Sequence, residues 1–474
     1  MTSEPPSPGL LDRFAAIVGP AHALRDAADT APHAVDWRKL FRGRPALVLK
    51  PRTTGEVSAI LKLATETGTP VVPQGGNTGL VGGAAPDASG RSVVLSTSRM
   101  SAIREIDTSS NTMTVEAGAV LHAVREAAEG ADRLFPLSLA SGGSAQVGGL
   151  LATNAGGTGV LAYGNARDLC LGLEVVLPTG EVLDDLRKLR KDNTGYDLKN
   201  LVIGAEGTLG VITAAVLKLT PRPRGVEVAW AGAASPEQAL RLFELASGLA
   251  GPGLTGFELI GDLALRFALL ADARAVAPLR ARWPWHVLLE LSSGRSAEDA
   301  RGMVEDLFER GLGQGLVGDA ALAVDERQRK AFWALREGLT EAQARQGASV
   351  KHDVAVPIAS LPRFIAEAGK AVAAVDPLAR VVCFGHMGDG NLHYNLSQPE
   401  GGGPEAFLAQ AKRFNDAVHG VVRALGGSFA AEHGIGRHKR DELSRTAPPV
   451  ALDLMRRIKR EFDPAGIMNP GVVL

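Results

Sequence analysis

The chain has 474 residues, and its 51 lysines and arginines nearly balance 52 aspartates and glutamates, giving a formal net charge of −1. This length predicts two or three domains with a core of ordinary size. The balanced charge, without a long run of one sign, argues against nucleic acid or an anionic membrane surface as a partner. No apolar run approaches the roughly 18 residues that a membrane span needs.

Two further features bear on the cellular compartment. The first residues, Met-Thr-Ser-Glu-Pro-Pro-Ser-Pro, lack the basic and apolar segments of a secretory signal. Cys170 and Cys383 are too few for a disulfide framework or a thiolate metal site, and we expect two buried thiols. The sequence therefore predicts a cytoplasmic protein.

The predicted fold is α+β, in four consecutive regions. Residues 1–44 form a polar lead and a helical segment. Residues 45–224 form a first α+β domain, with a helix at 54–67 and strands at 46–49, 71–72, 93–95, 113–115, 173–177 and 211–217. A proline-rich run at 221–225 predicts a boundary. A second α+β domain then occupies 225–430, with helices at 236–250, 297–310 and 326–344 and strands at 287–291 and 350–356, and residues 431–474 form a C-terminal segment.

Glycine accounts for 56 residues and is clustered, which indicates main chain lying close to a ligand. Segments 251–256 and 313–318 match the dinucleotide pattern G-x-G-x-x-G, but each follows a predicted helix, whereas that fingerprint must follow a strand and open a helix. We expect no nicotinamide site there.

Three other glycine clusters, at 73–83, 141–157 and 204–210, are better placed, the first directly after a strand. Taken singly, each could be a mobile loop. Together, loops that let successive amide groups converge on an anion indicate a long cofactor with a pyrophosphate and a large ring system.

The segments 73–83, 152–157 and 207–213 resemble the motifs of FAD-linked oxidoreductases with the vanillyl-alcohol-oxidase fold, within them the D-2-hydroxy-acid dehydrogenases of the D-2-hydroxyglutarate, D-lactate and glycolate types. The resemblance covers nearly the whole chain. It implies an FAD-binding domain, a second α+β substrate or cap domain, and a C-terminal segment that returns to the flavin. Because the 73–83 loop has neither His nor Cys, we expect non-covalent FAD.

The residues that the resemblance assigns to FAD lie in those loops and in the C-terminal signature 462–471, for which the alternative is a proline-terminated tail. They are Pro73, Gly75, Gly76, Asn77, Thr78, Gly79, Leu80, Ser144, Gly148, Gly149, Thr153, Asn154, Gly156, Gly157, Gly164, Gly207, Gly210, Ile212 and Asn469.

A second constellation surrounds the dipeptide Asp389-Gly390, a strong signal for a two-residue hairpin turn. Such a turn pairs His386 directly with His393, with Cβ atoms about 5 Å apart. Two facing imidazoles can share a metal, whereas a single histidine is usually structural. Glu432 supplies a carboxylate beside His433, and the set His386, His393 and Glu432 suits Zn²⁺, Mn²⁺ or Fe²⁺. The alternative for Glu432 and His433 is a structural ion pair; the resemblance favours zinc.

A third group combines Arg336 and Thr340, four residues apart in a predicted helix, with Lys351 in a predicted strand. Alone, Arg336 would be interpreted as a solvated surface charge. The resemblance to D-2-hydroxyglutarate dehydrogenases implies that these three groups bind the distal carboxylate of the substrate, and that Asn395 contacts its hydroxyl or carboxylate.

The expected activity is therefore the metal-assisted oxidation of a D-2-hydroxy acid, D-2-hydroxyglutarate first, to the 2-oxo acid, with hydride transfer to flavin N5. His433 would be the general base, because imidazole titrates near neutral pH. Electrons would pass to an electron-transfer flavoprotein, a quinone or a cytochrome. The alternatives are D-lactate or glycolate oxidation, a transferase like alkylglycerone-phosphate synthase, and a non-catalytic flavin-binding subunit. The oligomeric state is left open, a homodimer included.

Overall fold

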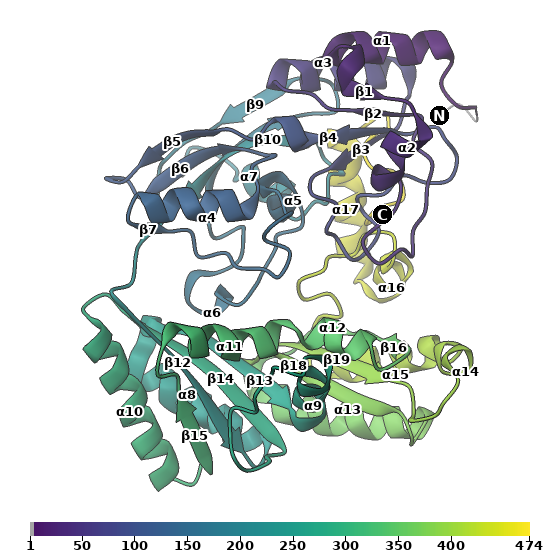
Figure 1. Cartoon of the computed structure of the whole chain (residues 1–474). Helices are drawn as coiled ribbons and strands as arrows, with labels where there is room; N and C mark the ends of the chain where they lie inside the picture. The colour runs from purple at the N-terminus through teal and green to yellow at the C-terminus, as the bar shows by residue number, and fades with distance from the viewer. Residues whose placement is uncertain (1–3) are drawn as a thin grey trace. The chain divides into compact units, whose positions relative to one another are not determined.

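The computed structural model describes residues 4–474, which form two compact units (Figure 1). The first unit contains the chain up to Gly157, Gly164–Arg222 and Glu432–Leu474, and the second contains Thr158–Tyr163 and Pro223–Ala431. The described residues of the expected regions 1–44, 45–224 and 431–474 thus fold together as one unit, except Pro223, Arg224 and Ala431 at the boundaries and a short segment inside the second region. The six residues Thr158–Tyr163, expected in the FAD-binding domain, belong to the second unit instead.

The first unit combines short helices with three sheets. Its α-helices are α1 (Pro8–Val18), α2 (Ala27–Thr30), α3 (Thr54–Thr67), α4 (Leu121–Gly130), α5 (Val147–Ala152), α7 (Lys199–Val202), α16 (Arg440–Thr446) and α17 (Pro449–Phe462). Its strands are β1 (Ala23–Leu24), β2 (Leu47–Leu49), β3 (Val71–Gln74), β4 (Val93–Ser96), β5 (Ile103–Asp107), β6 (Thr112–Glu116), β7 (Arg133–Leu134), β8 (Cys170–Val176), β9 (Val182–Asp185), β10 (Val211–Lys218) and β11 (Thr220–Pro221). Short 3₁₀ turns lie at Pro20–His22, Ala31–His33 and Thr97–Arg99.

The helix predicted at 54–67 is confirmed, and local signals explain both of its ends. The Thr53 hydroxyl accepts a hydrogen bond from the Glu56 amide, and Gly68 ends the helix in the left-handed conformation at φ 64°. The apolar side chains of α3 and α1 pack against the sheet β1-β2-β4-β3, in which β2, β4 and β3 run parallel. The other large sheet, β5-β6-β10-β8-β9, is antiparallel.

The C-terminal segment returns to β3. The Val71 amide donates to the Ile467 carbonyl, and the Asn469 amide donates to the Val71 carbonyl at 2.8 Å. Ile467 and Met468 are fully buried in the same core cluster as α1 and α3. The last residues therefore lie beside the strand from which the first glycine loop emerges.

The second unit is built on a sheet of order β15-β12-β14-β13-β18-β19-β16, with β17 also pairing with β19. Its strands are β12 (Gly225–Ala233), β13 (Leu254–Gly261), β14 (Trp285–Ser293), β15 (Asp319–Leu322), β16 (Ser349–Val350), β17 (Asp353–Ala355), β18 (Arg380–His386) and β19 (Asn391–Ser397). Its α-helices are α6 (Val160–Tyr163), α8 (Pro236–Ala250), α9 (Asp262–Ala271), α10 (Ala297–Gly313), α11 (Glu326–Glu337), α12 (Leu339–Ala344), α13 (Leu361–Val375), α14 (Pro404–Leu408) and α15 (Ala411–Ala424). Short 3₁₀ turns lie at Gly251–Gly253, Ile358–Ser360 and Met387–Asp389.

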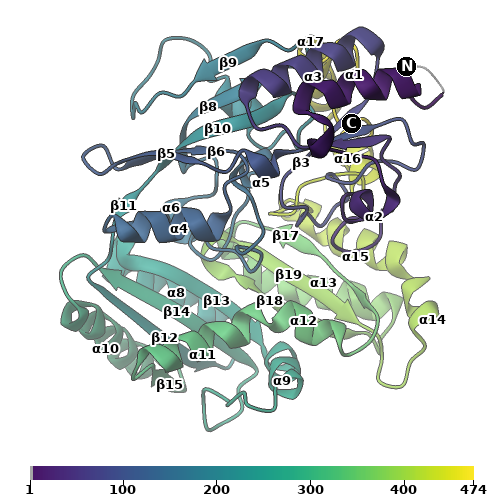
Figure 2. The same ribbon diagram turned by 45° about the horizontal axis from the view of Figure 1, so that its top comes forward.

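The two faces of this sheet have different helical covers. Side chains of α8, α10, α13 and α15 form one core cluster with alternate strand residues such as Leu289. Side chains of α9, α11 and α12 form a second core cluster with the strand residues that point to the opposite face, such as Leu288. Figure 2 shows α11 and α12 in front of the strands. A sheet covered on both faces explains why its strands are almost continuously apolar.

Several predicted elements of this unit are confirmed and two differ. The helix at 236–250 is present, that at 297–310 extends to Gly313, and the two G-x-G-x-x-G segments begin where helices end, as expected. The single helix predicted at 326–344 is wrong, because Gly338 separates α11 from α12. The strand predicted at 350–356 is interrupted at 351–352, where the His352 amide donates to the Asn395 side chain.

Both cysteines are buried and free, as expected. Within residues 4–474 the structure contains no helix with the length and hydropathy of a transmembrane span.

Candidate functional site

The first glycine loop passes so close to the second that position 76 has no room for a side chain. A Cβ atom on Gly76 would lie 1.9 Å from the Ser144 carbonyl oxygen. Asn77 adopts the left-handed conformation at φ 53°, and its side-chain nitrogen donates to the Val35 carbonyl at 2.8 Å. Main-chain geometry therefore requires glycine at position 76 and favours asparagine at position 77. Thr78 and Leu80 are half-buried in the same loop, and Gly79 is exposed.

The third loop completes the convergence. Gly207, at φ 70°, lies against Pro73, and the Glu206 amide donates to the Ala152 carbonyl at 2.8 Å. Gly148 and Gly149 lie in α5, where a Cβ atom on Gly148 would come within 2.8 Å of the Ala117 side chain. All three predicted loops thus meet around the end of β3.

The remaining predicted FAD residues have local structural roles, and their contact with FAD stays a prediction. The Thr153 hydroxyl donates to the Gly149 carbonyl, and the Asn154 side chain accepts from the Arg167 amide. Gly157 and Gly164 flank the segment that belongs to the second unit, with Gly156 buried beside them. Gly210 packs on β8, and Ile212 is buried in β10.

Asn469 ties the C-terminal segment to two of the loops. Its side-chain nitrogen donates to the Gly83 carbonyl at 2.9 Å and to the Glu206 carbonyl at 2.8 Å. The side-chain oxygens of Asn469 and Asn77 are buried without a hydrogen-bond partner, and the space beside Gly79 and Gly149 is open. Buried acceptors are normally satisfied, so a loop cluster with two unpaired acceptors and open glycines fits a bound group that carries donors.

In the second unit, the hairpin of β18 and β19 differs in register from the prediction. His386 pairs with Asn391, and His393 pairs with Phe384. The predicted two-residue turn is wrong, because Met387–Asp389 form a 3₁₀ turn that Gly390 ends at φ 86°. His386 and His393 are therefore diagonal neighbours on one face, with ring centroids 5.9 Å apart. Since a shift of two residues preserves the face, the two imidazoles still lie close together.

A buried carboxylate absent from our sequence prediction joins this hairpin to Arg336. Glu258, in β13, lies opposite His386 in the sheet. Its oxygens lie 2.6 Å from His386 Nδ1 and 2.6 Å from Arg336 Nε. The Arg336 guanidinium also lies over the Phe384 ring, 5.1 Å from its centroid. A carboxylate that holds Nδ1 of an imidazole fixes the orientation of the ring, an arrangement common at metal-ligating histidines.

Charge balance holds this cluster together. Burial alone would raise the pKa of Glu258, but the Arg336 and His386 side chains outweigh burial and lower it to about 2. Arg336 Nη2 is buried without a hydrogen-bond partner. A buried guanidinium with one nitrogen still to satisfy is suited to an anionic ligand. In the sequence, Glu258 is the single charged residue of a mostly apolar strand, and that pattern could have marked it as a paired charge.

The other predicted substrate residues lie around Arg336 in different settings. Thr340 is exposed in α12, beyond the break at Gly338. Lys351 is half-buried in the interruption between β16 and β17. The Asn395 side chain accepts from the His352 amide and donates to Gln343, so part of its bonding capacity maintains the sheet edge.

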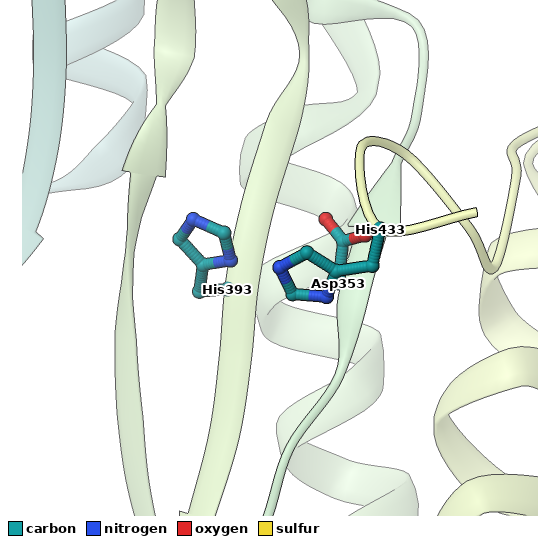
Figure 3. A group of neighbouring side chains, drawn as sticks. All are labelled: Asp353, His393 and His433. Carbon is teal, nitrogen blue, oxygen red and sulfur yellow. The ribbon is translucent and has the colours of Figure 1, made fainter. Parts of the chain in front are cut away.

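Two groups of side chains have the spacing of a metal site. Ligand atoms of His386, His393 and Glu432 lie within 4.8 Å of one another, as do those of Asp353, His393 and His433 (Figure 3). Asp353 lies opposite His393 in the ladder and was not predicted as a ligand. The Ala431 amide donates to the Asp353 carbonyl, so the residue that precedes Glu432 lies beside Asp353. Two imidazoles and one carboxylate fit a divalent cation such as Zn²⁺.

Comparison with known families decides the affiliation of the chain. Residues 45–185 match the family model described as an FAD binding domain, and residues 222–473 match the C-terminal domain of FAD linked oxidases. The chain belongs to the FAD-linked oxidase family. This confirms the expected resemblance, and the protein is an FAD-linked dehydrogenase.

Relatives and solved structures agree with this affiliation. The chain is 40% identical to D-2-hydroxyglutarate dehydrogenase of Bos taurus, covering 96% of this chain and 81% of that one. It is 34% identical to D-2-hydroxyglutarate dehydrogenase of Stutzerimonas stutzeri, covering 98% and 99%. A solved p-cresol methylhydroxylase superposes with a TM-score of 0.75 at 17% identity, covering 98% of this chain and 96% of that one. The predicted fold, that of vanillyl-alcohol oxidase, is confirmed.

The names of these relatives differ in the cellular compartment that they give. The bovine protein is named as mitochondrial, whereas the name of the bacterial one gives no compartment. The cytoplasmic location predicted for this chain stays a prediction.

Proposed function

We propose that the protein oxidises D-2-hydroxyglutarate to the 2-oxo acid with FAD as the oxidant, assisted by a divalent cation. The observation that carries the proposal is the position of Glu258, whose carboxylate contacts both the His386 imidazole, a candidate metal ligand, and the buried Arg336 guanidinium. Arg336 Nη2 has no hydrogen-bond partner. This arrangement suits a substrate whose hydroxy-acid end binds the cation and whose second carboxylate binds Arg336. Relatives at 34–40% identity carry the name of that activity.

Each residue then has a defined task. The ligands of the cation are His386, His393 and Glu432, with Asp353 beside them. Arg336 Nη2 binds the distal carboxylate, supported by Lys351 and Thr340. Asn395 contributes its remaining amide hydrogen to the hydroxy-acid end. His433 accepts the hydroxyl proton on an imidazole nitrogen, since histidine is the side chain that most often serves as a general base.

FAD supplies the acceptor for the C2 hydride, and the cation, by preference Zn²⁺, acidifies the C2 hydroxyl when it is bound. The three glycine loops and Asn469 hold FAD without a covalent bond. Electrons leave to an external acceptor, an electron-transfer flavoprotein, a quinone or a cytochrome.

D-lactate is the second candidate substrate. A relative of Schizosaccharomyces pombe, 37% identical over 94% of this chain, is named a putative D-lactate dehydrogenase. D-lactate has a methyl group where D-2-hydroxyglutarate has a second carboxylate, so it would leave the buried Arg336 guanidinium without an anionic ligand. We therefore rank D-2-hydroxyglutarate first.

The test is an anaerobic titration of the purified yellow protein with D- and L-2-hydroxyglutarate, D-lactate and glycolate. We expect D-2-hydroxyglutarate to bleach the flavin absorbance, and a chelator to abolish bleaching until Zn²⁺, Mn²⁺ or Fe²⁺ is restored. The variant His433→Gln should keep its colour and lose bleaching. A colourless wild-type protein, or bleaching that survives metal removal, would contradict the corresponding part of the proposal.

The role of Arg336 is tested by substrate discrimination. Arg336→Met removes a charge-assisted contact of about 1.5–3 kcal/mol, so kcat/KM for D-2-hydroxyglutarate should fall roughly 10- to 100-fold while that for D-lactate changes little. Arg363→Met, on an exposed arginine of α13, is the matched control. An equal decrease in kcat/KM for both acids would show that Arg336 does not bind the distal carboxylate.

A further inference from the structure

Glu206 lies in the third glycine loop in a main-chain conformation that glutamate rarely adopts. Its φ is 52°, in the left-handed region. This conformation costs free energy unless the surroundings compensate for it. The loop on either side is made of small residues, Ala205 and Gly207, and the Glu206 side chain is buried. An acidic side chain held inside the protein in a strained conformation requires a specific partner.

That partner is the main chain just after His433. Glu206 Oε1 accepts from the Ile435 amide at 2.7 Å, and Oε2 accepts from the Gly436 amide at 2.8 Å. Gly434 passes so close that a Cβ atom on it would lie 2.7 Å from Oε1. Gly434 and Gly436 both have positive φ, at 80° and 54°. The carboxylate therefore fixes a tight glycine bend directly beside Glu432 and His433.

The main chain of Glu206 is anchored as firmly as its side chain. Its amide donates to the Ala152 carbonyl of the second glycine loop, and its carbonyl accepts from the Asn469 side chain. One residue thus connects two loops proposed to hold FAD, the C-terminal segment and the bend after His433. All of these contacts lie within the first unit.

We propose that Glu206 is a positioning residue that fixes the bend Gly434–Gly436 and thereby presents Glu432 and His433 for metal binding and proton transfer. The inference rests on the proposed function for the roles of Glu432 and His433. It assigns Glu206 no contact with substrate, because both of its oxygens accept amides of the bend.

The test compares Glu206→Gln with the wild-type protein. Glutamine keeps the length and one acceptor oxygen, but its NH₂ group faces an amide that needs an acceptor. Substituting a residue that supports a metal ligand typically lowers metal affinity or activity by 10- to 100-fold. We expect Zn²⁺ affinity and kcat each to fall at least tenfold, with bound FAD unchanged and hydrogen exchange of the Ile435 and Gly436 amides accelerated.

Two further variants separate positioning from stability. Gly434→Ala displaces the bend from the carboxylate while Glu206 remains, and should reproduce the loss of Zn²⁺ affinity. Glu174→Gln removes another buried carboxylate of the first unit, which accepts from the Thr54 and Thr213 hydroxyls. We expect it to lower the melting temperature and to leave hydrogen exchange of the Ile435 and Gly436 amides unchanged.

The results distinguish this inference from the proposed function. If wild-type protein binds no metal and oxidises no 2-hydroxy acid, the proposed function fails, whereas amide exchange still tests the clamp. Glu206→Gln with wild-type exchange, metal affinity and turnover would overturn the inference. The inference would also be overturned if Glu206→Gln lost FAD and melted at a lower temperature to an extent that accounts for the whole decrease in turnover.

Discussion

The buried ion pair of Glu258 and Arg336 makes a quantitative prediction about the second unit. The side chains are 1% and 8% exposed, and their charged atoms lie 2.6 Å apart. Removing one partner of such a pair leaves the other charge buried, which costs about 3–5 kcal/mol. Replacing both with apolar side chains of similar volume is often neutral or stabilising. We therefore expect the double variant Glu258→Met/Arg336→Met to be more stable than either single variant.

The two single variants should differ, because the charges left behind respond differently. In Glu258→Met, Arg336 stays charged, since a guanidinium does not lose its proton in a protein, and only the Phe384 ring remains beneath it. In Arg336→Met, Glu258 keeps His386 and can also take up a proton. Glu258→Met is therefore the more destabilising change.

The measurement is urea unfolding followed by tryptophan fluorescence. Four of the five tryptophans lie in the second unit, while Trp37 in the first is 59% exposed, so fluorescence reports mainly on the second unit. The cycle should give a coupling free energy of at least about 3 kcal/mol. The exposed pair Arg363 and Glu367 should give less than about 1 kcal/mol. Additive losses at Glu258 and Arg336 would refute the reasoning.

Three shorter predictions concern the glycine loops and the core. Gly76→Ala brings a Cβ atom to 1.9 Å from a carbonyl oxygen and should yield protein without flavin absorbance, whereas Gly143→Ala, with open space at that position, should keep it; two yellow proteins would contradict this. Asn469→Asp places an anion opposite two carbonyl oxygens and should lower FAD affinity and melting temperature, measured by fluorescence titration and calorimetry; unchanged values would show that the tie is dispensable. Burial lowers the pKa of His286 from 6.5 to about 4, so the unfolded chain binds a proton that the folded one does not, and the free energy of unfolding should fall from pH 6.5 to pH 4 by up to about 1.4 kcal/mol per unit. His286→Gln should flatten that slope in urea titrations, and an unchanged slope would assign it to other groups.

Local features of the sequence predicted local structure well. The helices at 54–67 and 236–250 are correct to the residue, because Thr53 and Ser235 cap them and glycines follow them. The two-residue turn predicted at Asp389-Gly390 is wrong because the hairpin loop is longer: Met387–Asp389 form a 3₁₀ turn and Gly390 follows in the left-handed conformation. The prediction that His386 and His393 share a face survived, since side-chain alternation has a period of two.

The sequence by itself identified the glycine-rich loops, the histidines that could share a cation, and the family motifs that the chain carries. Only the tertiary structure revealed Glu258 beneath His386 and Arg336, and Glu206 beneath the bend after His433. Both carboxylates act across large separations in sequence, 128 residues from Glu258 to His386 and 229 from Glu206 to Ile435. Chain spacing carries no signal at that range, because the pairing of a buried charge is set by which strands and loops the whole fold brings together.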